Sequence, residues 1–152
     1  MEKNLESYRI GVIADTHNRW EPSIADHFKG VNEIWHLGDI CKESILDELR
    51  AISPKLEVVL GNNDFTLNYP YTRQLERCGE SFHLVHIQPA RIPPGTNWLL
   101  FGHTHRQCNV MEGAVHFFNP GSAGKANKGA PASVGMLTST AGQPFQAEII
   151  LL

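Results

Sequence analysis

Three short apolar runs in this sequence end in the same way, with a glycine followed by a polar side chain that can bind a metal ion. The three endings are Leu37-Gly38-Asp39, Leu60-Gly61-Asn62 and Phe101-Gly102-His103. Short apolar runs bounded by turn residues are typical of buried strands, and glycine lets the backbone turn sharply and pass close to a neighbouring group. Because the carboxyl ends of strands in an open α/β sheet gather at one edge, the repeated ending predicts one polar site built from distant parts of the chain.

The N-terminal part of the chain alternates expected strands and helices. Pro22 suits the first turn of a helix, and Gly30 stops it. The expected strands here are Tyr8–Ile13, Val31–Leu37 and Leu56–Leu60, and the expected helices are Pro22 to about Lys29 and Glu43–Arg50.

After Asp64 the pattern changes to strands separated by turns. Glu112-Gly113 between two apolar runs is a strong hairpin signal. The expected strands are Tyr71–Leu75 with Ser81–Ile87, Trp98–Phe101, Gln107–Met111 with Ala114–Asn119, and Ser133–Thr138 with Pro144–Leu151. Strand–helix units followed by hairpins predict the α/β class, as a two-sheet α/β/β/α sandwich with helices on its outer faces.

The length and the charge of the chain limit its class. With 152 residues the chain suits one domain over residues 1–152. The net charge of −3 argues against extended nucleic-acid binding. Met1–Ser7 is too polar for the core of a secretory signal, and no apolar run is long enough to span a bilayer. Cys41, Cys78 and Cys108 are scattered and form no CxxC pair, so we expect reduced thiols in a cytoplasmic protein. Assembly into a homo-oligomer is compatible with the sequence.

Seven side chains are candidates for the site at the strand ends. They are Asp15, His17, Asp39, Asn62, His86, His103 and His105. Oxygen and imidazole donors without a thiolate favour manganese, iron, zinc or magnesium, and seven donors exceed the needs of one four-coordinate structural zinc. Asp39, with two carboxylate oxygens, suits a bridge between two cations. Such a pair is adapted to phosphoryl chemistry, because it activates water and neutralises charge on the phosphate.

Five motifs occur in a fixed order along the chain. They are Asp15-Thr16-His17, Gly38-Asp39, Gly61-Asn62-Asn63-Asp64, His86 and Gly102-His103-Thr104-His105. Together they resemble the calcineurin-like metallophosphoesterases, in particular the small bacterial and archaeal YfcE-like phosphodiesterase branch. Asn119-Pro120-Gly121-Ser122 also resembles that branch, and the resemblance covers nearly the whole chain.

The resemblance implies the two-sheet α/β/β/α sandwich and a binuclear centre. It assigns Asp15, His17, Asp39 and His105 to one metal, and Asp39, Asn62, His86 and His103 to the other. Manganese is the expected ion, with iron, zinc, magnesium or nickel as alternatives. A metal-bridging hydroxide would attack the phosphorus, with Asp39, Asn62 and His103 as the central catalytic residues.

Two positions depart from the pattern of larger relatives. Those relatives carry a histidine after the ligand asparagine, which can protonate the leaving group, whereas this chain has Asn63. His86 is followed by Ile87-Gln88 instead of glycine and histidine, and the stretch up to Leu100 is too short for the helix that relatives insert there.

Each candidate also has a plain structural interpretation. Asp15 or Asp39 alone could cap a turn or a helix. The altered flanking motif weakens the interpretation of His86 as a ligand. His36, between Trp35 and Leu37, is expected to be a buried or outer-sphere histidine rather than a ligand. Five flanking residues could meet the phosphate of a substrate or could be ordinary loop side chains: Asn18, Arg19, Asn63, Arg106 and Ser122.

The function expected from this pattern is hydrolysis of a small phosphoester substrate. Diesters are favoured over monoesters, because the chain offers no arginine cluster to grip a dianion. A non-catalytic scaffold of the same fold, as in retromer-subunit relatives, is the alternative, although a scaffold would be free to lose ligands that this chain keeps. A protein phosphatase is disfavoured by Asn63 and by the short chain.

Overall fold

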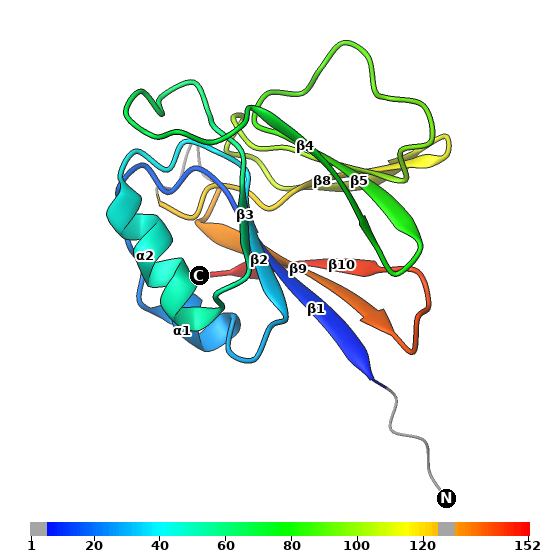
Figure 1. Cartoon of the computed structure of the whole chain (residues 1–152), viewed down its shortest axis with the longest axis horizontal. Helices are drawn as coiled ribbons and strands as arrows, with labels where there is room; N and C mark the ends of the chain where they lie inside the picture. The colour runs from blue at the N-terminus through cyan, green and yellow to red at the C-terminus, as the bar shows by residue number, and fades with distance from the viewer. Residues whose placement is uncertain (1–5, 125–129) are drawn as a thin grey trace, which may run out of the picture.

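Two facing five-stranded sheets form the body of the molecule, in a computed structural model that describes residues 6–124 and 130–152 (Figure 1). Most of the polar start Met1–Ser7 therefore lies outside the described residues. The first sheet has the order β10-β9-β1-β2-β3 and the second β4-β5-β6-β8-β7. The strands of the first sheet are β1 (Ser7–Ile13), β2 (Glu33–His36), β3 (Leu56–Val58), β9 (Ser133–Thr140) and β10 (Gln146–Leu151). Those of the second are β4 (Thr72–Arg77), β5 (Glu80–Val85), β6 (Trp98–Leu100), β7 (Cys108–Glu112) and β8 (Val115–Asn119).

Each sheet contains three neighbouring parallel strands. β1 pairs in parallel with β2, and β2 with β3, because a helix connects each consecutive pair. In the second sheet β6 pairs in parallel with both β5 and β8. The carboxyl ends of these parallel strands point to one edge of the sandwich, which is where the candidate ligands follow.

The main core lies between the two sheets and is rich in aromatic side chains. Trp35 of the first sheet contacts Phe82 of the second edge to face, with ring centroids 5.0 Å apart. Phe82 also stacks on Trp98 at 5.9 Å. Alternation along β5 places Phe82 and Leu84 in this core and Val85 on the outer face of the second sheet. This alternation determines which face of the second sheet each side chain occupies.

Both described helices cover the outer face of the first sheet. They are α1 (Ser23–His27) and α2 (Glu43–Ile52), and Ile24, Leu46 and Leu49 pack on that face (Figure 1). Neither of the two helices in the described part of the chain is long and apolar enough to cross a membrane.

A loop takes the place of a helix over the second sheet. Within the described residues no helix lies between β5 and β6, and Ile92 of this connection packs on Val85 and Leu99. Three prolines, Pro89, Pro93 and Pro94, oppose a helix here, since proline lacks an N–H and restricts the residue before it. The expected two-sheet α/β sandwich is confirmed, but its described helices cover the outer face of the first sheet alone. The expectation that this segment is too short for the inserted helix is confirmed as well.

The expected strands and helices are all present, with ends shifted by one or two residues in most of them. One example is the third strand, which was expected to reach Leu60 but ends at Val58. Leu60 instead donates its N–H to the carbonyl of Pro70, outside the sheet ladder. Strand ends depend on long-range pairing rather than on the apolar pattern, so this is the least predictable feature.

Glu33 of β2 ties the two sheets together at the end away from the candidate site. Its carboxylate is fully buried, and it accepts hydrogen bonds from Arg77 Nε of β4 at 2.7 Å and from Trp35 Nε1 at 2.7 Å. Tyr8 also donates its hydroxyl to this carboxylate. A buried carboxylate requires such partners, because an unpaired buried charge is very costly.

Candidate metal centre

The loops that follow the parallel strands of both sheets are tied together by backbone hydrogen bonds. Asp15 donates its N–H to the carbonyl of Gly38, and His17 to that of Asp39, each at 3.0 Å. In the second sheet Gly102 donates to the carbonyl of His86 at 2.9 Å. His103 then joins the two sheets, since its N–H donates to Asp15 Oδ2 at 3.0 Å. The strand ends therefore converge as the sequence predicted.

Left-handed backbone is concentrated in these loops. Five of the seven expected ligands have a positive φ, namely Asp15 (56°), His17 (46°), Asp39 (56°), His103 (70°) and His105 (61°). A residue other than glycine pays roughly 1–3 kcal/mol for a sparsely populated conformation and keeps it only where the surroundings enforce it. Such residues cluster at functional sites, and nothing in the local sequence pattern predicts them.

Glycine is required where the loops approach one another. A Cβ at Gly61 would overlap the Asp39 carboxylate, and one at Gly38 would lie 2.8 Å from His86 Nδ1. Gly38 also has a φ of 101°. The glycines of the repeated strand ending therefore allow the close passage that the sequence indicated.

Two groups of donor atoms share one carboxylate. Asp15, His17 and His105 form the first, and Asp15, Asp39 and His86 the second, with the ligand atoms of each group within 4.8 Å of one another. Asp15 Oδ1 lies 3.6 Å from His17 Nε2, 3.4 Å from His105 Nε2 and 3.7 Å from His86 Nε2. The arrangement has the oxygen and nitrogen donors that divalent cations such as manganese and zinc accept.

The Asp39 carboxylate lies near two of these histidines, His17 and His86. Its Oδ2 is 3.5 Å from His17 Nε2 and 3.3 Å from His86 Nε2. Asn63 holds the carboxylate in place, since its N–H donates to Oδ1 and its Nδ2 to Oδ2, both at 2.9 Å. Asp39 therefore faces both donor groups, which suits the bridging position expected from the sequence.

The donor set fits a cation because its buried atoms lack other partners. Asp15 Oδ1 and His86 Nε2 are buried and make no hydrogen bond within the described residues. His86 Nδ1 donates to the carbonyl of Leu37 at 2.8 Å, so the lone pair of the neutral ring is on Nε2. Fixing the tautomer through the other ring nitrogen is the usual arrangement of a histidine that binds a metal.

The Asp39 carboxylate favours the ionised form. Burial alone would raise the pKa of Asp39, but His86 and the two hydrogen bonds from Asn63 outweigh it and hold the pKa well below its usual range. The Asp15 carboxylate raises the pKa of His17, against the effect of burial. Burial lowers the pKa of His86, yet Asp39 and Asp15 raise it by more. Negative charge at this edge thus attracts cations, either protons or metal ions.

Asn62 and His103 form the exposed rim of the same site. Asn62 Oδ1 and His103 Nδ1 are 3.2 Å apart, and both residues are exposed. The structure therefore brings all seven expected ligands to one edge of the sandwich.

The five flanking candidates have different surroundings. Asn18, Arg19 and Arg106 are exposed loop residues, and Asn63 contacts Asp39. Ser122 is only 1% exposed, and its hydroxyl donates to the carbonyl of Asp15 at 3.0 Å. This hydrogen bond therefore supports the loop that contains Asp15.

His36 is buried, as expected for a residue outside the ligand set. Its Nδ1 accepts the N–H of Gly38 at 3.1 Å, and its Nε2 lies 3.1 Å from Thr16 Oγ1. Burial lowers the pKa of His36 to about 3, so the ring is neutral. It connects the loops after β1 and β2 without reaching the donor atoms.

Asp64 has a supporting role that the sequence reasoning did not assign. Its Oδ2 accepts the N–H groups of Asp39 and Gly61 at 2.8 and 2.7 Å, and its Oδ1 accepts that of Cys41 at 2.8 Å. The side chain is 4% exposed. The one available signal was its place in Gly61-Asn62-Asn63-Asp64, beside the ligand asparagine.

Comparisons with known proteins agree with this geometry. The family model of the calcineurin-like phosphoesterase superfamily domain matches residues 8–142. A protein named probable metallophosphoesterase from Methanothermobacter thermautotrophicus is 32% identical over an alignment of 160 positions, and the alignment spans 93% of this chain and 91% of the relative.

Solved structures share the fold at lower identity. Vacuolar protein sorting 29 from Cryptosporidium parvum has a TM-score of 0.77 at 16% identity, covering 96% of this chain and 99% of the other. A structure described as a novel archaeal phosphodiesterase has a TM-score of 0.75 at 18% identity, covering 93% and 99%. The resemblance noted in the sequence is thereby confirmed, and the chain belongs to the calcineurin-like phosphoesterase superfamily.

Proposed function

We propose that this protein is a binuclear metal-dependent phosphoesterase that hydrolyses small phosphodiesters. The observation that carries the proposal is Asp15 Oδ1, which belongs to both donor groups, is buried, and has no hydrogen-bond partner within the described residues. A buried carboxylate oxygen surrounded by three imidazoles is adapted to a cation rather than to folding alone.

The residues divide between two ions as the family resemblance implies. Asp15, His17, Asp39 and His105 would hold one ion, and Asp39, Asn62, His86 and His103 the other. When bound, two such ions lower the pKa of a water molecule and neutralise charge on a phosphate. Manganese is the ion we propose to test first.

The chain's own groups orient the site. Asn63 fixes both oxygens of Asp39, and the carbonyl of Leu37 fixes the ring of His86. Asn62 and His103, at the exposed rim, are placed to meet the phosphate of an incoming substrate. Diesters are preferred in this proposal because a monoanionic phosphate needs no arginine cluster.

A non-catalytic scaffold is the second candidate function. The likeness in fold to vacuolar protein sorting 29 is compatible with it. The complete set of seven donors favours the enzyme, because a scaffold has no need for buried carboxylates and histidines with unpartnered donor atoms.

The deciding experiment uses purified protein of measured metal content. With manganese, the wild type is expected to hydrolyse bis(4-nitrophenyl) phosphate faster than 4-nitrophenyl phosphate. His103→Ala should lower the rate more than about 100-fold. His27→Ala, a histidine of α1 outside the site, should leave the rate unchanged. A chain that binds two ions yet hydrolyses no ester above the metal-containing buffer would contradict the enzyme and favour the scaffold.

A further inference from the structure

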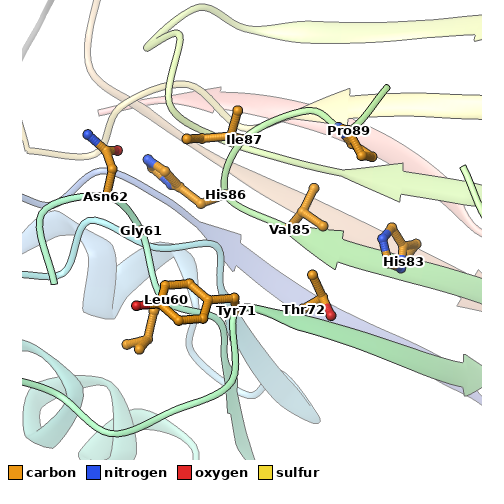
Figure 2. Close-up of a pocket in the computed structure, with 10 residues that line it drawn as sticks. All are labelled: Leu60, Gly61, Asn62, Tyr71, Thr72, His83, Val85, His86, Ile87 and Pro89. Atoms are coloured by element: carbon orange, nitrogen blue, oxygen red, sulfur yellow. The ribbon is translucent and has the colours of Figure 1, made fainter. Parts of the chain in front are cut away.

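A hollow of about 320 Å³ opens directly beside the candidate metal centre. Asn62 and His86 lie at one end of it and His83 at the other (Figure 2). Tyr71 and Thr72 line one side, and Ile87 and Pro89 line the opposite side (Figure 2). The remaining lining residues are Leu60, Gly61 and Val85.

The hollow exists because of the connection that replaces a helix over the second sheet. Val85 and Thr72 are paired neighbours on the outer face of β5 and β4. Pro89 belongs to the proline-containing loop after β5, which crosses this face without forming a helix. Space is thus left between the loop and the edge strand β4.

The lining is apolar and carries no fixed charge. None of the ten lining residues is a lysine, arginine, aspartate or glutamate. His83 is 7% exposed, and burial lowers its pKa below the ordinary value, so its ring is neutral at pH 7. Tyr71 is 67% exposed and Ile87 52% exposed, so apolar surface continues to the mouth of the hollow. A concave, mostly apolar lining with a few polar side chains is the usual form of a small-molecule site.

The position of the hollow relates its occupant to the reacting phosphate. Asn62 and His86 belong both to its wall and to the ligand set of one ion. A group that fills the hollow therefore lies next to a phosphate held at the centre. A cavity of roughly 150 Å³ is able to bind benzene, so the volume of the hollow admits one or two aromatic rings.

We propose that this hollow is the subsite for an uncharged aromatic ester group of the phosphodiester substrate, with Tyr71 and Thr72 as its side wall. The inference rests on the proposed function and names its substrate class. Aromatic groups gain both area burial and ring contacts with Tyr71 in such a place. Charged ester groups are disfavoured, because the lining has no charged side chain to pair with them.

The first test measures equilibrium binding, independently of turnover. Manganese-loaded protein is titrated calorimetrically with 2-naphthylmethylphosphonate and with methylphosphonate, which share the phosphonate and contain no ester bond. The naphthyl compound should bind on the order of ten- to a hundred-fold more tightly, since it buries a ring system. Equal affinities would overturn the proposal.

Variants locate the effect in the hollow. Thr72→Trp, on the exposed face of edge strand β4, should fill the space and remove most of the preference for the naphthyl compound. Val110→Trp is the matched control, because Val110 is also a β-branched exposed residue on the other edge strand, β7, of the same sheet. Tyr71→Ala, which removes a wall without filling the hollow, should weaken the preference by roughly three- to tenfold. An unchanged preference in Thr72→Trp, with a melting temperature like that of Val110→Trp, would overturn the proposal.

The assay with bis(4-nitrophenyl) phosphate separates this inference from the proposed function. Thr72→Trp should lower kcat/KM about tenfold or more, mainly through KM, while Val110→Trp should not. A naphthyl preference without any hydrolysis would support the subsite and contradict the enzyme. Hydrolysis without that preference would support the enzyme and overturn the subsite. A further outcome would also contradict the proposal. The wild type would sediment as a dimer in ultracentrifugation, Thr72→Trp would sediment as a monomer, and neither would prefer the naphthyl compound. The hollow would then be an interface between two copies of the chain.

Discussion

Asp39 shows at the scale of one residue how this chain holds a charge inside a protein. The carboxylate is 2% exposed, faces His17 and His86, and is fixed by two hydrogen bonds from Asn63. Its backbone adopts a left-handed conformation that an aspartate rarely takes. Burial of the charge and the left-handed backbone are both unfavourable, so we infer that the role of Asp39 depends on its charge.

Asp39→Asn should abolish activity while the fold survives. The amide keeps the size of the side chain but not the charge that two cations share. Changing a residue that only supports a metal ligand lowers activity by up to about 100-fold, so we expect a larger loss of activity for this ligand. Activity is measured in buffers of controlled metal content. Asp47→Asn, an exposed position on α2, is the control. Activity within a few-fold of the wild type would contradict the bridging position of Asp39.

His36→Gln should lower stability more than metal binding. The ring is fully buried and contacts Gly38 and Thr16, so its loss leaves buried polar groups without partners, at about 1–3 kcal/mol. Urea unfolding without metal measures the stability, and elemental analysis measures bound manganese. A variant that melts like the wild type but binds less metal would place His36 among the ligands instead.

The rate should fall steeply as the pKa of the leaving group rises. Asn63 has no dissociable proton and is held by Asp39, and Asp64 already accepts three backbone N–H groups. The neutral His36 ring has a pKa of about 3, so it cannot serve as an acid near neutrality. General acids contribute typically 10²–10⁴-fold, most of all for poor leaving groups.

A series of phosphodiesters with leaving groups of increasing pKa, at saturating manganese, measures this dependence. Nitrophenyl esters should react readily, and alkyl or nucleoside esters slowly. A flat dependence with chemistry as the rate-limiting step would show that another group supplies the proton.

At the scale of elements, β2 and β4 are joined across the two sheets by one buried carboxylate. Glu33 of β2 accepts hydrogen bonds from Arg77 of β4, and from Tyr8 and Trp35 of its own sheet. Burial would raise the pKa of Glu33, but these hydrogen bonds outweigh it and hold the pKa below its usual value of 4.5. The contact therefore stabilises the fold only while Glu33 is ionised.

Glu33→Gln should destabilise the protein by about 2–3 kcal/mol at pH 7, since Arg77 loses its buried partner. Because the folded pKa is depressed, the wild-type advantage is complete above pH 4.5 and is lost as the pH falls through the lower folded value. Urea unfolding from pH 7 downwards measures the difference. Glu48→Gln, exposed on α2, should show no such effect. A difference independent of pH in this range would contradict an ionised Glu33.

At the scale of the whole molecule, the candidate metal centre lies where the two sheets meet. Asp15, Asp39 and Asn62 follow strands of the first sheet, whereas His86 and His103 follow strands of the second. The hydrogen bond that the His103 N–H donates to Asp15 crosses this junction without any metal ion. Ions held by ligands from both sheets would therefore link them.

Manganese should accordingly raise the melting temperature, and EDTA should reverse the rise. A ligand at 100 times its dissociation constant stabilises by about 2.7 kcal/mol per site. Differential scanning calorimetry measures the shift, and Asp39→Asn is expected to reduce it. Equal melting temperatures with and without manganese would contradict a centre that bridges the sheets.

The order of strands and helices, and the residues that gather at the strand ends, could be predicted from the amino-acid sequence. Both are local signals, because apolar runs, turn residues and the glycine before Asp39, Asn62 and His103 can be read within a few positions. Parallel strands then place their carboxyl ends together whatever the details of pairing.

How those residues are held, and what surrounds them, could not be predicted before the folded structure was known. Three features join segments that are distant in the sequence. They are the position of β8 between β6 and β7, the contact of Asn63 with Asp39, and the hydrogen bond from Arg77 to Glu33. The hollow beside His86 depends on the path of the loop around Pro89 over β4 and β5. Such features follow from burial of the whole core and from pairing of every buried polar group, which no local pattern contains.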